Sequence, residues 1–138
     1  MRVTLPHDYK PSDAEPFMNA LQQEYFRQKL LRWRDQLVRE STETLSHLQQ
    51  ESLNEPDITD RASLETDRAL ELRTRDRARK LISKIDEALK RIEDGSYGFC
   101  EETAQPIGLK RLEARPIATL SIEAQERHER QERQYRDD

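Results

Sequence analysis

Asn54-Glu55-Pro56-Asp57-Ile58-Thr59-Asp60-Arg61-Ala62 separates two long helical patterns and decides the fold. Pro56 lacks a backbone donor and disfavours helical backbone just before it, so the first helix should end there. Thr59 or Asp60 could cap the next helix. If the helices pair antiparallel, this turn lies at the far end of the pair and presents Asp57 and Asp60. Such a turn is usually a solvated connection. The alternative is an acidic probe that enters a cavity of a larger partner.

The composition favours an extended helical protein. Of 138 residues, 33% are hydrophobic and 38% are charged, which is too polar for a single round core. The 24 basic and 28 acidic residues give a net charge of -4, so nucleic acid is attracted little. No apolar run could span a bilayer, no signal-peptide pattern precedes the body, and one cysteine excludes an internal disulfide. We expect a soluble, cytoplasmic protein with little attraction to nucleic acid and no segment that spans a membrane.

Two helices are expected around this break, as an antiparallel two-helix coiled coil over residues 17–94. The first carries a narrow apolar stripe of Phe26, Leu30, Trp33 and Leu37, continued by Leu45 and Leu48. The second, expected over residues 61–94, carries Ala78, Leu81, Ile85, Ala88 and Ile92 at alternating steps of three and four. Narrow stripes between charged faces are typical of a helix pair. The dense charge before Ala78 predicts looser packing towards the tip at residues 54–62.

Three shorter segments complete an all-α architecture. Residues 1–16 contain three prolines and predict an N-terminal arm that is mobile unless it docks on the body. Residues 95–122 contain all three glycines and predict a small globular unit, with Gly95 ending the second helix. Its core is expected to contain Tyr97, Phe99, Ile107, Leu109, Leu112, Ile117 and Leu120. Residues 123–138 predict a solvated C-terminal helix.

Two segments carry a resemblance to a known family. The first is Asp57-Ile58-Thr59-Asp60-Arg61-Ala62, followed by the charged helical stretch 70–82. The second is Gly95-Ser96-Tyr97-Gly98-Phe99-Cys100, followed by the run Pro-Ile-Gly-Leu-Lys-Arg-Leu-Glu-Ala-Arg-Pro at 106–116. In this order they resemble the DksA/TraR family of bacterial transcription regulators. The resemblance extends from about Phe17 to about His128.

The resemblance implies a monomeric regulator that binds RNA polymerase directly and does not bind DNA. Members of the family insert a coiled coil into the secondary channel of the polymerase, with an acidic tip near the active site, so the expected partners are the β and β′ subunits. Carried over by position, the tip residues of this chain are Asp57, Asp60, Arg61 and Ala62. A carboxylate near the catalytic Mg²⁺ can perturb a rate-limiting isomerisation through its charge.

The resemblance also implies cooperation with ppGpp, the alarmone of the stringent response, bound between regulator and polymerase. The positions that match its basic contacts are Arg77, Lys80 and Lys84. They share one helix face, as a phosphate-rich ligand requires. The alternative is that they only solvate the helix pair. One basic contact expected in the last helix has no counterpart here, and Gln125 stands near its place.

Typical members of the family carry a four-cysteine zinc site. The four positions of this chain read Cys100, Thr103, Ser121 and Ala124. Structural zinc sites use four Cys or His ligands, and no histidine falls in the pattern, so we predict a unit without zinc or any other metal. We expect Cys100 to be a small, partly buried residue. The alternative is a redox-sensing thiol, but nearby negative charge at Glu101 and Glu102 disfavours the thiolate.

Two other classes of function remain for comparison. A coiled-coil adaptor or chaperone unrelated to polymerase would dock partners along the helix pair and would tolerate loss of Asp57 and Asp60. An enzyme is not expected, because an exposed tip offers no pocket that could shift a pKa or exclude water. The sequence also contains no glycine-rich phosphate loop, nucleophile elbow or HExxH motif.

Overall fold

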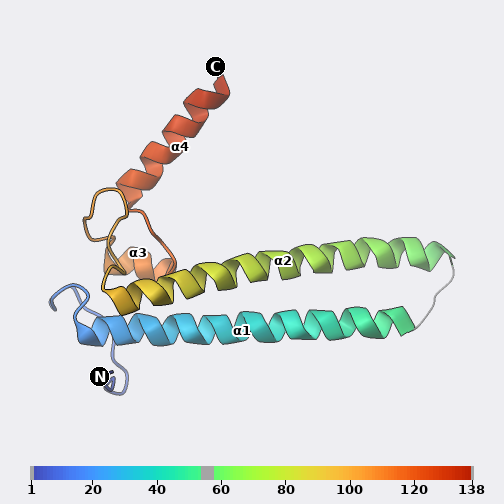
Figure 1. Ribbon diagram of the computed structural model, residues 1–138, viewed down its shortest axis with the longest axis horizontal. Coiled ribbons are helices and arrows are strands. Elements are labelled where there is room, and N and C mark those ends of the chain that lie inside the picture. Colours follow the sequence, from blue (N-terminus) through green and yellow to red (C-terminus); the bar gives the residue numbers. More distant parts are fainter. Residues whose placement is uncertain (1, 54–57, 138) are drawn as a thin grey trace. The chain divides into compact units, whose positions relative to one another are not determined.

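The computed structural model describes the backbone of residues 2–53 and 58–137 and the side chains of residues 2–47 and 63–135. The described chain forms four helices, α1 (Ala20–Leu53), α2 (Ile58–Asp94), α3 (Leu109–Ala114) and α4 (Ile122–Asp137). Helices α1 and α2 pack together side by side and antiparallel (Figure 1). This confirms the predicted all-α class with a long helix pair and a C-terminal helix. None of the described helices is long and apolar enough to cross a membrane.

The chain divides into two compact units. The first unit comprises Met1–Leu30 and Glu87–Asp138, and the second unit comprises Leu31–Asp86. The first unit therefore contains the arm, the paired beginning of α1 and end of α2, and helices α3 and α4. The second unit contains the remainder of the helix pair.

The ends of α2 follow the backbone chemistry of the flanking residues. Gly95 follows the last helical residue with a φ of 84°, so it ends the helix as predicted. The N–H group of Ser96 donates to the Arg91 carbonyl at 3.0 Å, which satisfies an acceptor that the helix end leaves unpaired. At the other end, α2 begins at Ile58 rather than at Arg61. A proline restricts mainly the residue before it, so helical backbone is available soon after Pro56.

Helix α1 begins three residues later than the expected coiled-coil boundary at Phe17. Met18 has a φ of 55°, which lies in the left-handed region and cannot be part of a right-handed helix. The side-chain oxygen of Asn19 then accepts a hydrogen bond from the Gln22 N–H group at 2.9 Å. Asn19 therefore caps α1.

The first unit holds the main core. Its fully or nearly buried apolar residues include Phe26, Leu30, Ala88, Ile92, Tyr97, Ile107, Leu109, Leu112 and Ile117. The rings of Phe26 and Tyr97 lie 5.8 Å apart, and the Tyr97 hydroxyl donates to the Pro116 carbonyl at 2.7 Å. The buried phenol is thus satisfied. Of the core predicted for the globular unit, Phe99 and Leu120 are only partly buried.

Within the first unit, the N-terminal arm packs on α1 through the fully buried side chain of Gln22. Its amide nitrogen donates to the Ser12 carbonyl at 3.2 Å, and its oxygen accepts from the Met18 N–H group at 2.8 Å. The Tyr9 hydroxyl donates to the Glu15 carboxylate at 2.8 Å and thereby lowers the pKa of Glu15. A buried amide that bonds the arm backbone explains why the arm lies against the body.

The second unit has little buried apolar surface among its described side chains. Those that are buried are Leu37, Ala78 and Ile85. Leu45 was expected to continue the stripe of α1, but it is 39% exposed. Eight residues after Leu37, it is rotated by about 80° around the helix, so it lies off the seam. Among the described side chains of this unit, the helices are also joined by the Arg34–Asp86 ion pair at 2.7 Å and by a contact of 2.9 Å between His47 Nδ1 and the Glu71 carboxylate.

Candidate functional site

The predicted acidic tip lies only partly within the described residues. Asp57 is outside them. Asp60, Arg61 and Ala62 lie at the start of α2, where the backbone is described and the side chains are not. The first turn of a helix favours a carboxylate, because its unpaired N–H groups carry partial positive charge. Position 60 therefore suits an aspartate, while the role of the tip stays a prediction.

The three predicted basic positions share one face of α2 in the second unit. Arg77, Lys80 and Lys84 are all exposed. Steps of three and four residues keep them within an arc of about 60°. Among residues with described side chains, none forms an ion pair with these three. In the first unit, the Gln125 amide donates to the Glu129 carboxylate at 3.3 Å, so a neutral group stands at the fourth position.

The residues at the four expected zinc positions do not fit a zinc ion. The Ser121 hydroxyl accepts a hydrogen bond from the Ala124 N–H group at 3.2 Å and caps α4, and the Thr103 hydroxyl accepts from the Gln105 N–H group at 3.3 Å. Ala124 is fully buried and offers a methyl group instead of a ligand. Structural zinc requires four sulfur or nitrogen donors, and Cys100 supplies one. Within the described residues, no group of three or more His, Cys, Asp or Glu side chains could hold a metal.

Cys100 is more buried and more acidic than expected. Only 3% of the residue is exposed. Burial raises the pKa of the thiol, but hydrogen bonds from the Thr103 hydroxyl and from the backbone N–H groups of Ser121, Thr103 and Glu102 together lower it to about 6. The expectation that Glu101 and Glu102 would keep the thiol protonated is therefore wrong. Both side chains are exposed, where solvent screens their charge, whereas the donors contact the sulfur directly.

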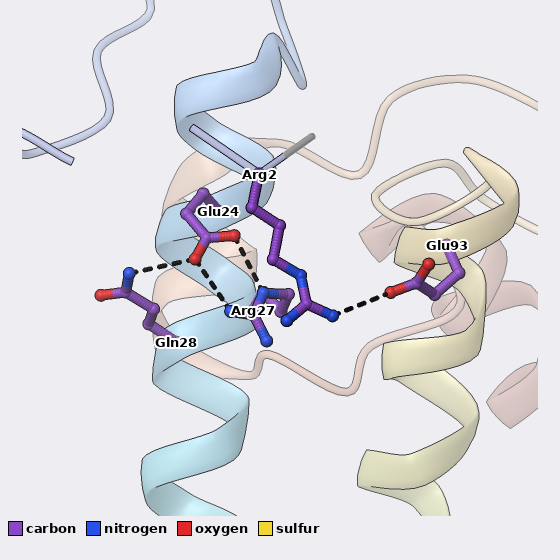
Figure 2. Close-up of polar contacts among 5 residues, drawn as sticks. All are labelled: Arg2, Glu24, Arg27, Gln28 and Glu93. Carbon is purple, nitrogen blue, oxygen red and sulfur yellow. Dashed lines mark hydrogen bonds and ion pairs between the residues drawn. The ribbon is translucent and has the colours of Figure 1, made fainter. Parts of the chain in front are cut away.

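A polar cluster of the first unit was not singled out from the sequence. Figure 2 shows Arg27 donating to both carboxylate oxygens of Glu24, at 2.9 and 3.0 Å, and Gln28 donating to the same carboxylate at 3.1 Å. The Arg27 contact lowers the pKa of Glu24. Beside it, Arg2 of the arm pairs with Glu93 of α2 at 3.5 Å. The spacing of Glu24 and Arg27 was the available signal, but such pairs are common on helices.

Two family models match the chain. Residues 22–92 match DnaK suppressor protein DksA, N-terminal domain, and residues 95–130 match the prokaryotic dksA/traR C4-type zinc finger. Both matches confirm the resemblance seen in the sequence. The zinc-finger match gives no support to the prediction of a metal-free unit, which rests on the residues at the four ligand positions.

Individual proteins are similar over nearly the whole chain. The RNA polymerase-binding transcription factor DksA of Caulobacter vibrioides is 72% identical over 131 residues, which are 95% of this chain and 92% of that protein. The protein of the same name from Escherichia coli K12 is 46% identical over 129 residues, 94% of this chain and 84% of that one. The solved structure of transcription factor DksA2 from Pseudomonas aeruginosa has a TM-score of 0.81 at 45% identity, and the match covers 87% of this chain and 95% of that one.

Proposed function

The chain belongs to the DksA family, and from this premise we propose that it is a bacterial transcription regulator that binds RNA polymerase directly. The observation that carries the proposal is the 72% identity, over 95% of the chain, to a relative named for polymerase binding. The relatives are named as transcription factors. Their names favour this function over an enzyme and over an adaptor unrelated to polymerase. We place the protein in the cytoplasm, where bacterial RNA polymerase works.

The proposed point of action is the tip of the helix pair, inserted into the secondary channel of polymerase, with the β and β′ subunits as the proposed partners. Helices α1 and α2 contain 34 and 37 residues. At about 1.5 Å per residue each is roughly 50 Å long, which suits entry into a deep channel. Carboxylates at Asp57 and Asp60 would alter the local potential near the catalytic Mg²⁺. The tip then needs no chemistry of its own, and Arg61 and Ala62 complete its contact surface.

The proposed effector is ppGpp, bound where the regulator meets polymerase. Arg77, Lys80 and Lys84 present three exposed cations on one face of α2, and clustered cations are what phosphate groups require. A hydrogen bond to a charged group contributes about 1.5–3 kcal/mol when well formed. Because Gln125 is neutral, this chain offers ppGpp one basic contact fewer than the family pattern implies.

The regulator acts on polymerase rather than on DNA. Its net charge of -4 opposes binding to a phosphate backbone. We propose that it works as a monomer and that it binds neither DNA nor membranes.

The test compares Asp60→Asn with the parent in two assays, affinity for purified polymerase and transcription from a ppGpp-responsive promoter. We expect affinity to change by less than about threefold, because docking spreads along the helix pair and the globular unit and one charge of the tip contributes little to it, while regulation is lost. Asp67→Asn, an exposed carboxylate further along α2, is the matched control and should regulate normally. A parent that fails to bind polymerase contradicts the function. An Asp60→Asn variant that regulates like the parent contradicts only the tip mechanism.

A further inference from the structure

A pocket of the first unit lies where the N-terminal arm meets the beginning of α1 and the end of α2. Its volume is about 360 Å³, within the range of roughly 300–1,000 Å³ that small-molecule sites occupy. Its lining residues all belong to the first unit. They include the four charged residues of Figure 2, which are Arg2 of the arm, Glu24 and Arg27 of α1, and Glu93 of α2. The proposed function leaves this pocket unused.

The two arginines of the pocket retain hydrogen-bond donors. A guanidinium group has more N–H donors than one carboxylate can accept, and Arg27 uses only Nε and Nη2 to hold Glu24. Its other donors have no partner among the described residues. Within the same part of the chain, Arg2 forms an ion pair only with Glu93, at 3.5 Å, which is longer than a usual hydrogen bond. Both guanidinium groups can therefore donate to a further acceptor.

The two ion pairs of the pocket differ in how firmly they are held. The side chains of Glu24 and Arg27 are 8% and 18% exposed, and Gln28 also donates to the Glu24 carboxylate, at 3.1 Å. The side chains of Arg2 and Glu93 are 63% and 69% exposed, and an ion pair this exposed contributes little to stability. A ligand can therefore separate Arg2 from Glu93 easily, while the Glu24–Arg27 pair stays in place.

We propose that this pocket binds a free α-amino acid with an aliphatic side chain. The carboxylate of the ligand accepts hydrogen bonds from Arg27 and Arg2. Its ammonium group takes a place beside Glu93, and its side chain contacts the apolar part of the lining, which consists of Val3, Ala20 and Ile92. Such binding requires no polymerase, so it is independent of the proposed function.

The charge balance of the pocket favours a zwitterion over a simple ion. Two arginines and two glutamates line the pocket, so their formal charges cancel. An anion such as phosphate would bond the guanidinium groups but would lie close to Glu93, which then loses its counter-charge. A cation would meet the opposite difficulty at the arginines. An α-amino acid brings one charge of each sign, so every charged group keeps a partner.

The test titrates leucine into the purified full chain and follows the backbone amide signals by NMR. Saturable shifts are expected at residues 2–3, 20–27 and 92–93, with a Kd of about 1–10 mM, as suits a small ligand in a pocket with an exposed rim. The analogue 4-methylpentanoate keeps the carboxylate and the side chain but lacks the ammonium group. Leucinamide lacks the carboxylate charge. Each should bind about tenfold more weakly than leucine (roughly 1.4 kcal/mol).

One variant separates a contact with the ligand from a structural role. Glu93→Gln removes the charge that faces the ammonium group and should weaken leucine binding about tenfold (roughly 1.4 kcal/mol). The same variant releases Arg2, so 4-methylpentanoate should bind at least as tightly as it does to the parent. Glu87→Gln is the matched control, because Glu87 is an exposed glutamate of the same helix and unit that does not line the pocket. It should bind leucine like the parent.

Three results would overturn the proposal. The first is the absence of saturable shifts in the parent at up to about 50 mM leucine, well above the expected Kd. The second is binding of 4-methylpentanoate or phosphate as tight as that of leucine, which would indicate an anion site. The third is a Glu93→Gln variant that binds leucine like the parent, and thermal unfolding of each variant checks that its fold is retained. Polymerase is absent from these measurements, so a failure here leaves the proposed function standing.

Discussion

The Cys100 thiol shows how backbone donors set the chemistry of one side chain. Its pKa of about 6 is well below the ordinary value of about 8.5. A group whose pKa is lower in the folded state than in the unfolded state stabilises the fold above the unfolded pKa. That contribution is lost as the pH falls through the folded value. The folded state should therefore gain stability from Cys100 as the pH rises from about 6 to about 8.5.

Replacing Thr103 should make the thiol less acidic. Thr103→Val removes the side-chain donor to the sulfur, so the pKa of Cys100 should rise from about 6. Thr103→Ser keeps the hydroxyl and should leave the pKa near its parent value. The ultraviolet absorbance of the thiolate, followed during a pH titration, measures this directly, with Cys100→Ala as the blank. A parent midpoint near 8.5 would contradict the account of the donors.

At the scale of elements, Gly98 lets Phe17 and Met18, which link the arm to α1, approach the globular unit. Its φ of 92° disfavours any side chain, and a Cβ atom there would lie 3.0 Å from Cγ of Met18 and 3.3 Å from Cζ of Phe17. The ring of Phe17 in turn packs edge-on against Phe99, with centroids 5.4 Å apart. One small residue thus leaves the space in which Phe17 and Met18 pack against the globular unit.

Gly98→Ala should lower the free energy of unfolding by more than Gly95→Ala does. Both glycines have a positive φ, which costs an alanine about 1–2 kcal/mol. A Cβ atom at Gly95 meets nothing within 4 Å, so that variant isolates the backbone cost. Gly98→Ala adds the collision with Met18 and Phe17. Denaturant unfolding of both variants gives the comparison, and equal losses would mean that the arm moves away at no cost.

The parts of the fold that depend on local pattern could be predicted from the sequence. The steps of three and four residues identified the seam residues Phe26, Leu30 and Leu37, and Gly95 marked the end of α2. Contacts between distant segments could not be predicted. The amide of Gln22 is buried because the arm folds back onto it. Cys100 is acidic partly because the backbone of Ser121, distant in sequence, points a donor at it.

For the candidate site, the residue types were predictable and their surroundings were not. The sequence places Arg77, Lys80 and Lys84 on one helix face. All three side chains are exposed, as contact with a ligand requires. Leu45 was placed on the seam, but it is 39% exposed. Leu31, Val38 and Leu45 are seven residues apart and all exposed, and this repeat was the signal that separates Leu45 from the seam.

At the scale of the whole molecule, the response to ppGpp should depend on the cluster on α2. Lys84→Ala and Arg77→Ala remove one cation each and should weaken the response to ppGpp more than the effect without ppGpp. Titration of ppGpp into transcription reactions measures both. Lys90→Ala, an exposed lysine of the same helix outside the cluster, is the control. Equal losses with and without ppGpp would mean that these residues only dock the helix pair.

The globular unit should fold without metal, although its family model is a zinc finger. In small zinc domains the metal contributes about 10–16 kcal/mol, so a chelator unfolds them. In this chain Ser121 caps α4, Ala124 is fully buried, and Ile107, Leu109 and Leu112 of the same globular unit are buried as well. Each buried aliphatic side chain contributes about 1.5–3 kcal/mol, so these three replace a large part of the stability that a metal site would supply.

Chelation should therefore leave the melting temperature of the purified protein unchanged to within about 2 °C, which is less than about 1 kcal/mol for a chain of this length. Elemental analysis of the same protein should find no stoichiometric zinc. The positive control is the triple variant Thr103→Cys, Ser121→Cys and Ala124→Cys, which restores four sulfur donors. That variant should bind one zinc ion and become sensitive to chelation. Stoichiometric zinc in the parent, or a parent melting temperature that falls on chelation, would show that other residues bind the metal.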